Sequence, residues 1–337
     1  MSAEKLLAVL LLAAVTFWLS GCASSGGLGS NVAASESDQS GHATTNNASI
    51  NRVLLVNTNN GIERYQSAQT AFMQTLHGPE LVQVDLAGDA NPVDRLQDIL
   101  NDNRFDAIYC IGAKALGAVD YIDKGIPVVY SSVLNWRRFA GQSNYFGVAS
   151  EVAPEAQLTW FRYFFPDIKK VGVLYSAENS KLIADASQAA KNLAIELVAE
   201  QIDSPAQLTT KLAAMASKVD VFWLISDPVV LSSPEKTQAM FSYAQQKKIP
   251  VVSYNRFFVE LGAVLSITAD LPTTGRQAAL MLQKIISRGA PTGSIQFPAG
   301  TTITLNMGKV RELGIKLNEG AFDAVNEIID AQAKPQN

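Results

Sequence analysis

The chain has 337 residues, a formal net charge of −4 and 47% hydrophobic residues. This length suggests two domains of about 150 residues each, and the apolar fraction is sufficient for packed cores. The small negative charge excludes the basic surface that nucleic-acid-binding proteins need, so we expect no nucleic acid partner.

The N-terminus carries an apolar run over residues 6–19, which ends in Leu19-Ser-Gly-Cys22. A run of about fourteen residues is too short to span a bilayer and has the length of a secretory signal. Leu19-Ser-Gly-Cys22 resembles the lipobox of bacterial lipoproteins, which implies a signal peptide over 1–21 and a lipid on Cys22. We expect this lipid anchor to hold the protein on a membrane. The alternatives are an ordinary signal peptide with an incidental cysteine, and an uncleaved anchor.

Residues 22–49 are dominated by Ser, Gly, Asn, Ala and Thr, which is typical of a flexible tether. By resemblance to enteric lipoproteins, Ala23 favours delivery to the outer membrane if the cell is Gram-negative. We therefore expect a lipid-anchored protein of the bacterial cell envelope that faces the periplasm. The other cysteine, Cys110, lies in an apolar run and is expected to be buried.

Three short apolar segments of the first half recur in the second half at a nearly constant offset. The pairs are Arg52–Asn57 with Lys170–Tyr175, Phe105–Gly112 with Val219–Ser226, and Gly125–Ser131 with Lys248–Tyr254. Runs of this kind are typical of strands buried on both faces of a parallel sheet.

Helical patterns alternate with these strands and continue after them. The predicted helices cover residues 61–75, 93–101, 114–124, 151–165, 180–193, 205–217, 234–247, 271–288 and 321–331. The alternation predicts an α/β protein with two doubly wound, Rossmann-like lobes joined by several crossings. We expect the first lobe in 50–147 with about 272–300, and the second in 148–271 with about 301–332. One long α/β sheet is the alternative.

Catalytic motifs are absent from the sequence. The two histidines, His42 and His77, have no metal ligands at suitable spacing, and there is no nucleophile elbow or phosphate-binding loop. We therefore expect no enzyme activity, no metal and no cofactor.

A binding cleft for a small molecule is better supported, because ligands of open α/β sheets sit beyond the carboxyl ends of the strands. Polar, glycine and aromatic residues gather at these predicted ends. The candidates are Asn57, Thr58, Asn59, Gly112, Ala113, Ser131, Ser132, Trp136, Tyr175, Ser176, Ser226, Asp227, Tyr254 and Asn255.

Each candidate also has a structural interpretation, because Ser, Asn and Asp cap helices and form turns. Asp227 could pair with a ligand amine or cap the helix that follows it. Trp136 could stack on a ligand ring or pack into the protein.

The second half resembles the ABC-transporter substrate-binding lipoproteins of the tryptophan/tyrosine-binding type. The segments that carry the resemblance begin with Lys170-Val-Gly-Val-Leu-Tyr, Val219-Asp-Val-Phe-Trp, Lys248-Ile-Pro-Val-Val, Gly262-Ala-Val-Leu, Gly275-Arg-Gln-Ala and Leu313-Gly-Ile. The resemblance implies a type I periplasmic-binding-protein fold with three crossings and a ligand enclosed by hinge closure. Candidate hinges are Ser150, Glu151, Asp270 and Leu271.

The family also implies a function: capture of an amino-acid-like small molecule, with aromatic amino acids among the family's ligands, for an ABC permease. A ligand sensor that reports to a membrane signalling protein is the main alternative, and an enzyme or a structural envelope protein are weaker ones. We expect a monomer.

Overall fold

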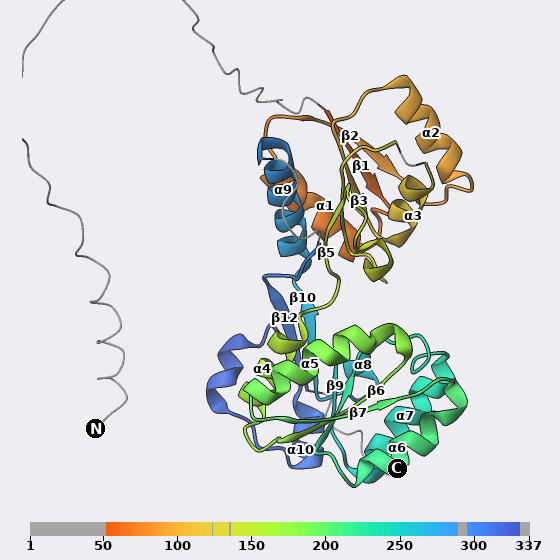
Figure 1. Cartoon of the computed structure of the whole chain (residues 1–337). Helices are drawn as coiled ribbons and strands as arrows, with labels where there is room; N and C mark the ends of the chain where they lie inside the picture. The colour runs from red at the N-terminus through yellow and green to blue at the C-terminus, as the bar shows by residue number, and fades with distance from the viewer. Residues whose placement is uncertain (1–51, 123, 135, 289–294, 331–337) are drawn as a thin grey trace, which may run out of the picture. The chain divides into compact units, whose positions relative to one another are not determined.

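A computed structural model describes residues 52–122, 124–134, 136–288 and 295–330. The predicted signal peptide, Cys22 and the tether lie outside these ranges. The described chain forms two β-sheets, each covered by helices (Figure 1). We call the first sheet with its helices the first lobe, and the second sheet with its helices the second lobe.

The sheet of the first lobe has six strands in the order β11-β5-β4-β3-β1-β2, and every pairing is parallel. The strands are β1 Arg52–Asn57, β2 Glu80–Asp85, β3 Ala107–Ile111, β4 Val128–Ser131, β5 Tyr145–Val148 and β11 Ile295–Gln296. The chain reaches β11 only after it has formed five strands of the second sheet, so the first lobe is assembled from distant parts of the sequence.

The sheet of the second lobe has seven strands in the order β13-β12-β10-β9-β8-β6-β7. All its pairings are parallel except that of β10 with β12. The strands are β6 Lys170–Tyr175, β7 Glu196–Gln201, β8 Val221–Leu224, β9 Val251–Ser253, β10 Leu265–Ala269, β12 Thr301–Asn306 and β13 Glu327–Ile329.

Helices cover both faces of each sheet. Those of the first lobe are α1 Glu63–Thr75, α2 Pro92–Asp102, α3 Ala113–Ile122 and α9 Leu271–Arg288, with the 3₁₀ turn η2 Trp136–Phe139. Those of the second lobe are α4 Pro154–Phe164, α5 Ser180–Asn192, α6 Leu208–Ala216, α7 Pro234–Lys247, α8 Phe257–Glu260 and α10 Met307–Leu313. Shorter 3₁₀ turns are η3 Ala177–Asn179, η4 Pro205–Gln207 and η5 Glu319–Ala324.

Alternate residues of the central strands enter different cores, as the pleat of a strand requires. On β1, Val53 and Leu55 pack with α1 and α9, whereas Leu54 and Val56 pack with α2 and α3. The second lobe has the same two-sided arrangement, with one core under α4 and α5 and another under α6 and α7. The prediction of two doubly wound α/β lobes is therefore confirmed.

The chain passes between the lobes three times. The first crossing, residues 149–153, joins β5 to α4; the second, at Asp270, joins β10 to α9; and the third, residues 297–300, joins β11 to β12. Both α1 and α9 start close to these crossings and pack side by side on the first sheet (Figure 1). The start of each helix is thereby available to a site near the crossings.

One predicted element is wrong. The final helix expected over 321–331 is instead the turn η5 followed by the strand β13, which pairs in parallel with β12. The register matches Thr304 with Glu327 and Asn306 with Ile329. Consecutive β-branched residues, Ile328 and Ile329, suit this strand, and the open edge of β12 supplies the backbone partners. Among the described residues, no helix combines the length and hydrophobicity needed to cross a bilayer.

Candidate functional site

A cavity of about 610 Å³ lies where the crossings meet residues of both lobes. We call it the central pocket. It is lined by Glu63, Arg64, Ser67, Ser132, Leu134, Ser150, Glu151, Tyr254, Asn255, Arg256, Thr268, Ala269, Asp270, Leu271, Pro272, Thr274 and Thr302. This volume falls within the range of small-molecule sites, about 300–1,000 Å³.

One wall of the central pocket is suited to an anion. The first turn of α1 lines it, and the unpaired backbone N–H groups of a helix start favour negative charge. The start of α9 lines it too, but Pro272 has no N–H and the N–H of Thr273 is bound by the Asp270 carboxylate. Arg64 adds a guanidinium that forms no ion pair with any described carboxylate. Its Nη2 donates to Tyr65 Oη at 2.7 Å, and the guanidinium lies 4.6 Å from the centre of the Tyr65 ring. Tyr65 thus holds Arg64 in place while its charge stays available.

Most acids around the central pocket are already paired within the chain. Asp270 accepts from the backbone N–H of Thr273 at 2.9 Å and lies 3.5 Å from Arg276. By contrast, the exposed Glu63 has no ion-pair partner among the described residues. The wall formed by α1 therefore offers one available cation, Arg64, and one available anion, Glu63.

Ser132 is the predicted ligand residue with the most unusual surroundings. Its backbone is left-handed, with φ of 58°, and its Oγ is buried without a hydrogen-bond partner. A non-glycine residue in this conformation stores strain that recurs at ligand sites. A buried hydroxyl also costs free energy until it is satisfied. Ser132 lines the central pocket, so a polar ligand atom could supply the missing bond.

The second lobe contributes Tyr254 and Asn255, which follow β9. Burial raises the pKa of Tyr254 more than its hydrogen bond to Ser226 lowers it, and the nearby Glu151 carboxylate raises it further. Tyr254 is therefore a neutral hydroxyl at physiological pH, able to donate or accept. Asn255 Oδ1 accepts from the backbone N–H of Phe257 at 3.0 Å, which fixes the turn that carries both residues.

The predicted residues at the end of β1 make hydrogen bonds within the first lobe and do not line the central pocket. Asn57 Nδ2 donates to Gln69 Oε1 at 2.6 Å, and Asn57 Oδ1 accepts from the backbone N–H of Asn59 at 2.9 Å. Thr58 Oγ1 accepts from the backbone N–H of Ala115 at 3.1 Å. These side chains fix the turn that leads into α1.

The predicted residues that follow β3 and β4 also have structural contacts. Gly112 has φ of 88°, and a Cβ there would lie 2.5 Å from Thr58 Oγ1. Only glycine fits that position, and Ala113 then begins α3. Ser131 Oγ lies 2.7 Å from Tyr109 Oη in the core.

Asp227 is buried and acts as a connector between strand ends. Its Oδ2 accepts from the backbone N–H and Oγ of Ser176, at 2.6 and 2.9 Å, and from Asn179 Nδ2 at 2.8 Å. Its Oδ1 accepts from the backbone N–H groups of Val229 and Val230 at 2.9 and 3.0 Å. Five donors of this chain therefore occupy its two oxygens.

Of the predicted ligand residues, the structure brings Ser132, Tyr254 and Asn255 together at the central pocket, with the predicted hinge residues Ser150, Glu151, Asp270 and Leu271. The predicted residues outside its lining are Asn57, Thr58, Asn59, Gly112, Ala113, Ser131, Trp136, Tyr175, Ser176, Ser226 and Asp227. Trp136 lies behind the lining, where its Nε1 donates to Glu151.

Sequence reasoning missed Arg64 and Glu63. Both lie in the first turn of the helix that follows the first strand, where the backbone N–H groups of a helix start are free. The rule that located the strand ends could have found them, had it been extended by one helical turn.

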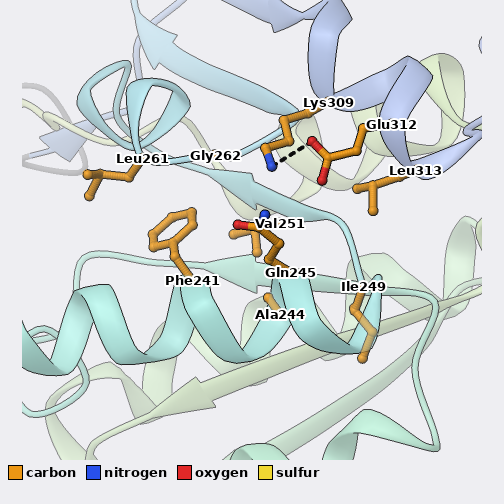
Figure 2. Close-up of a pocket in the computed structure, with 10 residues that line it drawn as sticks. All are labelled: Phe241, Ala244, Gln245, Ile249, Val251, Leu261, Gly262, Lys309, Glu312 and Leu313. Carbon is orange, nitrogen blue, oxygen red and sulfur yellow. Dashed lines mark hydrogen bonds and ion pairs between the residues drawn. The ribbon is translucent and has the colours of Figure 1, made fainter. Parts of the chain in front are cut away.

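Another cavity of about 20 Å³ lies between α7 and α10 (Figure 2). Phe241 and Val251 line its apolar side, and Lys309 Nζ lies 2.8 Å from Glu312 Oε2 on the other. It has room for about one water molecule and none for a solute. Among the described residues, no cluster of three or more His, Cys, Asp or Glu could hold a metal ion.

Comparison with known proteins gives the family and the fold. The family model "ABC transporter substrate binding protein" matches residues 83–328. No curated protein matches the chain. The solved structures similar to it include three with TM-scores above 0.5.

The first is a conserved domain protein from Vibrio cholerae, with a TM-score of 0.54 and 21% identity over 83% of this chain and 99% of that one. The second is an ABC domain in complex with L-Trp from Streptococcus pneumonia, with a TM-score of 0.54 and 18% identity over 82% and 100%. The third is the ligand-free, open structure of CD0873, a substrate-binding protein with adhesive properties from Clostridium difficile, with a TM-score of 0.64 and 17% identity over 84% and 100%.

At identities of 17–21% the solved structures show only the fold. The family of this chain is shown by the family model. The resemblance drawn from the sequence is confirmed, and so is its type I periplasmic-binding-protein fold. The chain belongs to the ABC transporter substrate-binding protein family.

Proposed function

We propose that this protein is a cell-envelope lipoprotein, anchored through Cys22, that captures a zwitterionic, amino-acid-like solute in the central pocket and delivers it to an ABC permease. The observation that carries the proposal is the pocket wall at the start of α1, where Arg64 and Glu63 have no ion-pair partners among the described residues. This wall favours a carboxylate, and the adjacent Glu63 favours an ammonium group. The L-Trp complex of the streptococcal neighbour supports the same ligand class.

Each part of such a solute has a candidate partner. The carboxylate would meet the N–H groups at the start of α1 and Arg64, and a charge-assisted bond there is about twice as strong as a neutral one. Ser132 and Tyr254 offer hydroxyls for further polar atoms of the ligand. Leu134, whose side chain is half exposed, offers apolar contact for the ligand side chain.

The test is ligand-dependent thermal stabilisation of the purified chain. A ligand at one hundred times its Kd should stabilise the protein by about 2.7 kcal/mol, which for a protein of this size raises Tm by about 5–10 °C. We expect a shift with one or more amino acids, and none with tryptamine, indole-3-propionate or neutral sugars at the same concentration. No shift with any amino acid would refute the ligand class.

Arg64→Gln should weaken the binding of an active amino acid at least tenfold, because the ligand carboxylate loses its charged partner. The matched control is Arg104→Gln, since Arg104 is exposed in the same lobe and does not line the central pocket. Equal affinities of the two variants would count against the role of Arg64.

Membrane attachment is tested separately. Labelled fatty acid should enter the wild-type chain during growth and should not enter the Cys22→Ser variant. Incorporation into that variant would refute an anchor on Cys22.

A further inference from the structure

The segment that follows β4 is fastened to the first crossing. Ser150 Oγ donates to the backbone carbonyl of Val133 at 2.8 Å. Glu151, the next residue of the crossing, binds both Trp136 and Arg137. Two neighbouring residues of the crossing thus hold the chain on either side of Leu134, which lines the central pocket.

Glu151, Trp136 and Arg137 form a mostly buried cluster of three side chains. The Glu151 side chain is only 9% exposed, its Oε2 accepts from Trp136 Nε1, and its Oε1 accepts from Arg137 Nη1 at 3.2 Å. The Arg137 guanidinium lies 4.4 Å from the centre of the Trp136 ring. Each member therefore contacts the other two, and removal of the carboxylate would leave a buried N–H and a partly buried charge unpaired.

The same tryptophan touches the third crossing. Trp136 meets Phe297 edge to face, with the ring centres 6.1 Å apart. Gln277 Nε2, from α9, donates to the Phe297 carbonyl at 3.1 Å. Trp136 consequently lies between two of the three segments that join the lobes.

From these contacts, and resting on the proposed function, we propose that Glu151 is a positioning residue for the ligand. It holds Trp136 and Arg137, and through them the turn that presents Ser132 and Leu134 to the central pocket. Ser132 keeps a left-handed backbone and an unpaired buried hydroxyl, a conformation that persists only when its surroundings fix it. Glu151 supplies part of that fixation, so it sets ligand affinity without providing the main ligand bond.

The first experiment needs no ligand. It compares hydrogen exchange in the full chain of the wild type, Glu151→Gln and Trp136→Phe. Glutamine keeps the shape of Glu151 but replaces one acceptor oxygen by an NH₂ donor. Trp136→Phe removes the Nε1 donor of the hydrogen bond between Trp136 and Glu151. We expect about tenfold faster exchange in peptides that contain Val133 and Trp136, with the sheet amides unchanged. The control is Glu155→Gln, because Glu155 is exposed on α4. Unchanged exchange of these peptides in both test variants would overturn the proposal.

The second experiment measures the affinity of the amino acid that stabilises the wild type most. Glu151→Gln should weaken its binding about tenfold, and in a Ser132→Ala background the same change should weaken it much less, because the positioned hydroxyl is already missing. A purely structural role would give equal losses in both backgrounds, and that result would overturn the proposal. If no amino acid binds the wild type, the proposed ligand class fails, while the exchange experiment still decides whether Glu151 holds the turn.

Discussion

The close packing of α1 on α9 depends on Gly275, and the variant Gly275→Ala tests it. A Cβ on Gly275 would lie 2.1 Å from the carbonyl oxygen of Ala68, 2.9 Å from its carbonyl carbon and 3.1 Å from its Cα. All three are backbone atoms of α1, so no side-chain rotation can relieve the clash. The two helices would have to separate by about 1 Å to restore van der Waals contact.

The expected magnitude is the difference of two effects. Overpacking of a tight interior costs about 1–3 kcal/mol, and alanine in place of glycine inside a helix returns about 0.8–1 kcal/mol. The difference is at most about 2 kcal/mol, and because the contact is with backbone atoms we expect Gly275→Ala to lower the free energy of unfolding by close to this amount, which corresponds to a Tm lower by a few degrees. Urea denaturation followed by circular dichroism measures the free energy, and a thermal scan measures Tm.

Gly117 in α3 provides the matched control. Apart from the adjacent residues and the helix's own backbone, no atom lies within 4 Å of a Cβ at this position, so Gly117→Ala should gain up to about 1 kcal/mol from helix propensity alone. A lower free energy of unfolding for Gly275→Ala and a higher one for Gly117→Ala would support the reasoning. A stabilised Gly275→Ala would show that the helices separate freely and would refute it.

The same variant should also affect the central pocket. Gly275 lies one turn after the start of α9, whose first residues line the pocket beside the start of α1. Separation of the helices would move Glu63 and Arg64 at the start of α1 away from the lining residues at the start of α9, so Gly275→Ala should weaken amino-acid binding and Gly117→Ala should not. Unchanged affinity in Gly275→Ala would mean that binding does not depend on the spacing of the two helix starts.

Asp227→Ala should cost about 2–4 kcal/mol in urea denaturation, because five donors lose their acceptor; a loss below 1 kcal/mol would mean that water replaces the carboxylate. In a Cys22→Ser chain, Cys110 should react with a thiol reagent only after unfolding, since it is fully buried and burial raises its pKa; rapid labelling of the folded protein would contradict this. The hydrogen bond from Arg256 lowers the pKa of Glu327 below its ordinary 4.5, so the pair stabilises the fold above pH 4.5 and loses this effect as the pH falls through the lower folded value. Glu327→Gln should therefore cost at most about 1 kcal/mol at pH 7, because both side chains are partly exposed, and the cost should shrink in acid; an equal cost at pH 7 and pH 3 would contradict the pairing.

The central elements of both lobes could be predicted because their signals are local. Helix α7 starts at Pro234 after the cap Ser233, whose Oγ accepts from the N–H of Lys236, and it ends before the left-handed Lys248. The buried strands β1, β3, β4, β6, β8 and β9 were found from their continuous apolar runs. In each case the residues that define the element lie within it or next to it.

Three of the strands that the sequence analysis does not predict, β2, β7 and β13, lie at sheet edges. Strands β2 and β7 mix polar and apolar residues with mostly partial burial, as edge strands do, so no continuous apolar run marks them. Strand β13 exists because β12 offers a free edge, and that edge is built by residues about twenty positions earlier. Sequence periodicity carries no information about such pairings.

The predicted ligand residues were chosen by a topological rule that points to the carboxyl ends of the strands. Of these residues, the structure places Ser132, Tyr254 and Asn255 at the central pocket. The rule could not distinguish side chains that face a ligand from those that bind neighbouring turns. Asn57 and Asp227 have the same chemistry as ligand residues, and only their contacts within the chain reveal a structural role.

The available charges of the central pocket also bear on the choice between neutral and charged solutes. A neutral solute that displaced water from the wall of α1 would leave Arg64 and Glu63 desolvated without partners, and each unpaired charge removed from water costs several kcal/mol. A zwitterion brings a carboxylate and an ammonium group, so it replaces the lost water at both positions. Because the other acids near the pocket already have partners in the chain, as Asp270 with Arg276 and Glu151 with Arg137 show, this adjacent pair should dominate the selection. We therefore expect sugars to be rejected because they would leave these two charges desolvated and unpaired, and not because of the pocket volume. The double variant Glu63→Gln, Arg64→Gln should lose its discrimination against sugars together with its affinity for amino acids.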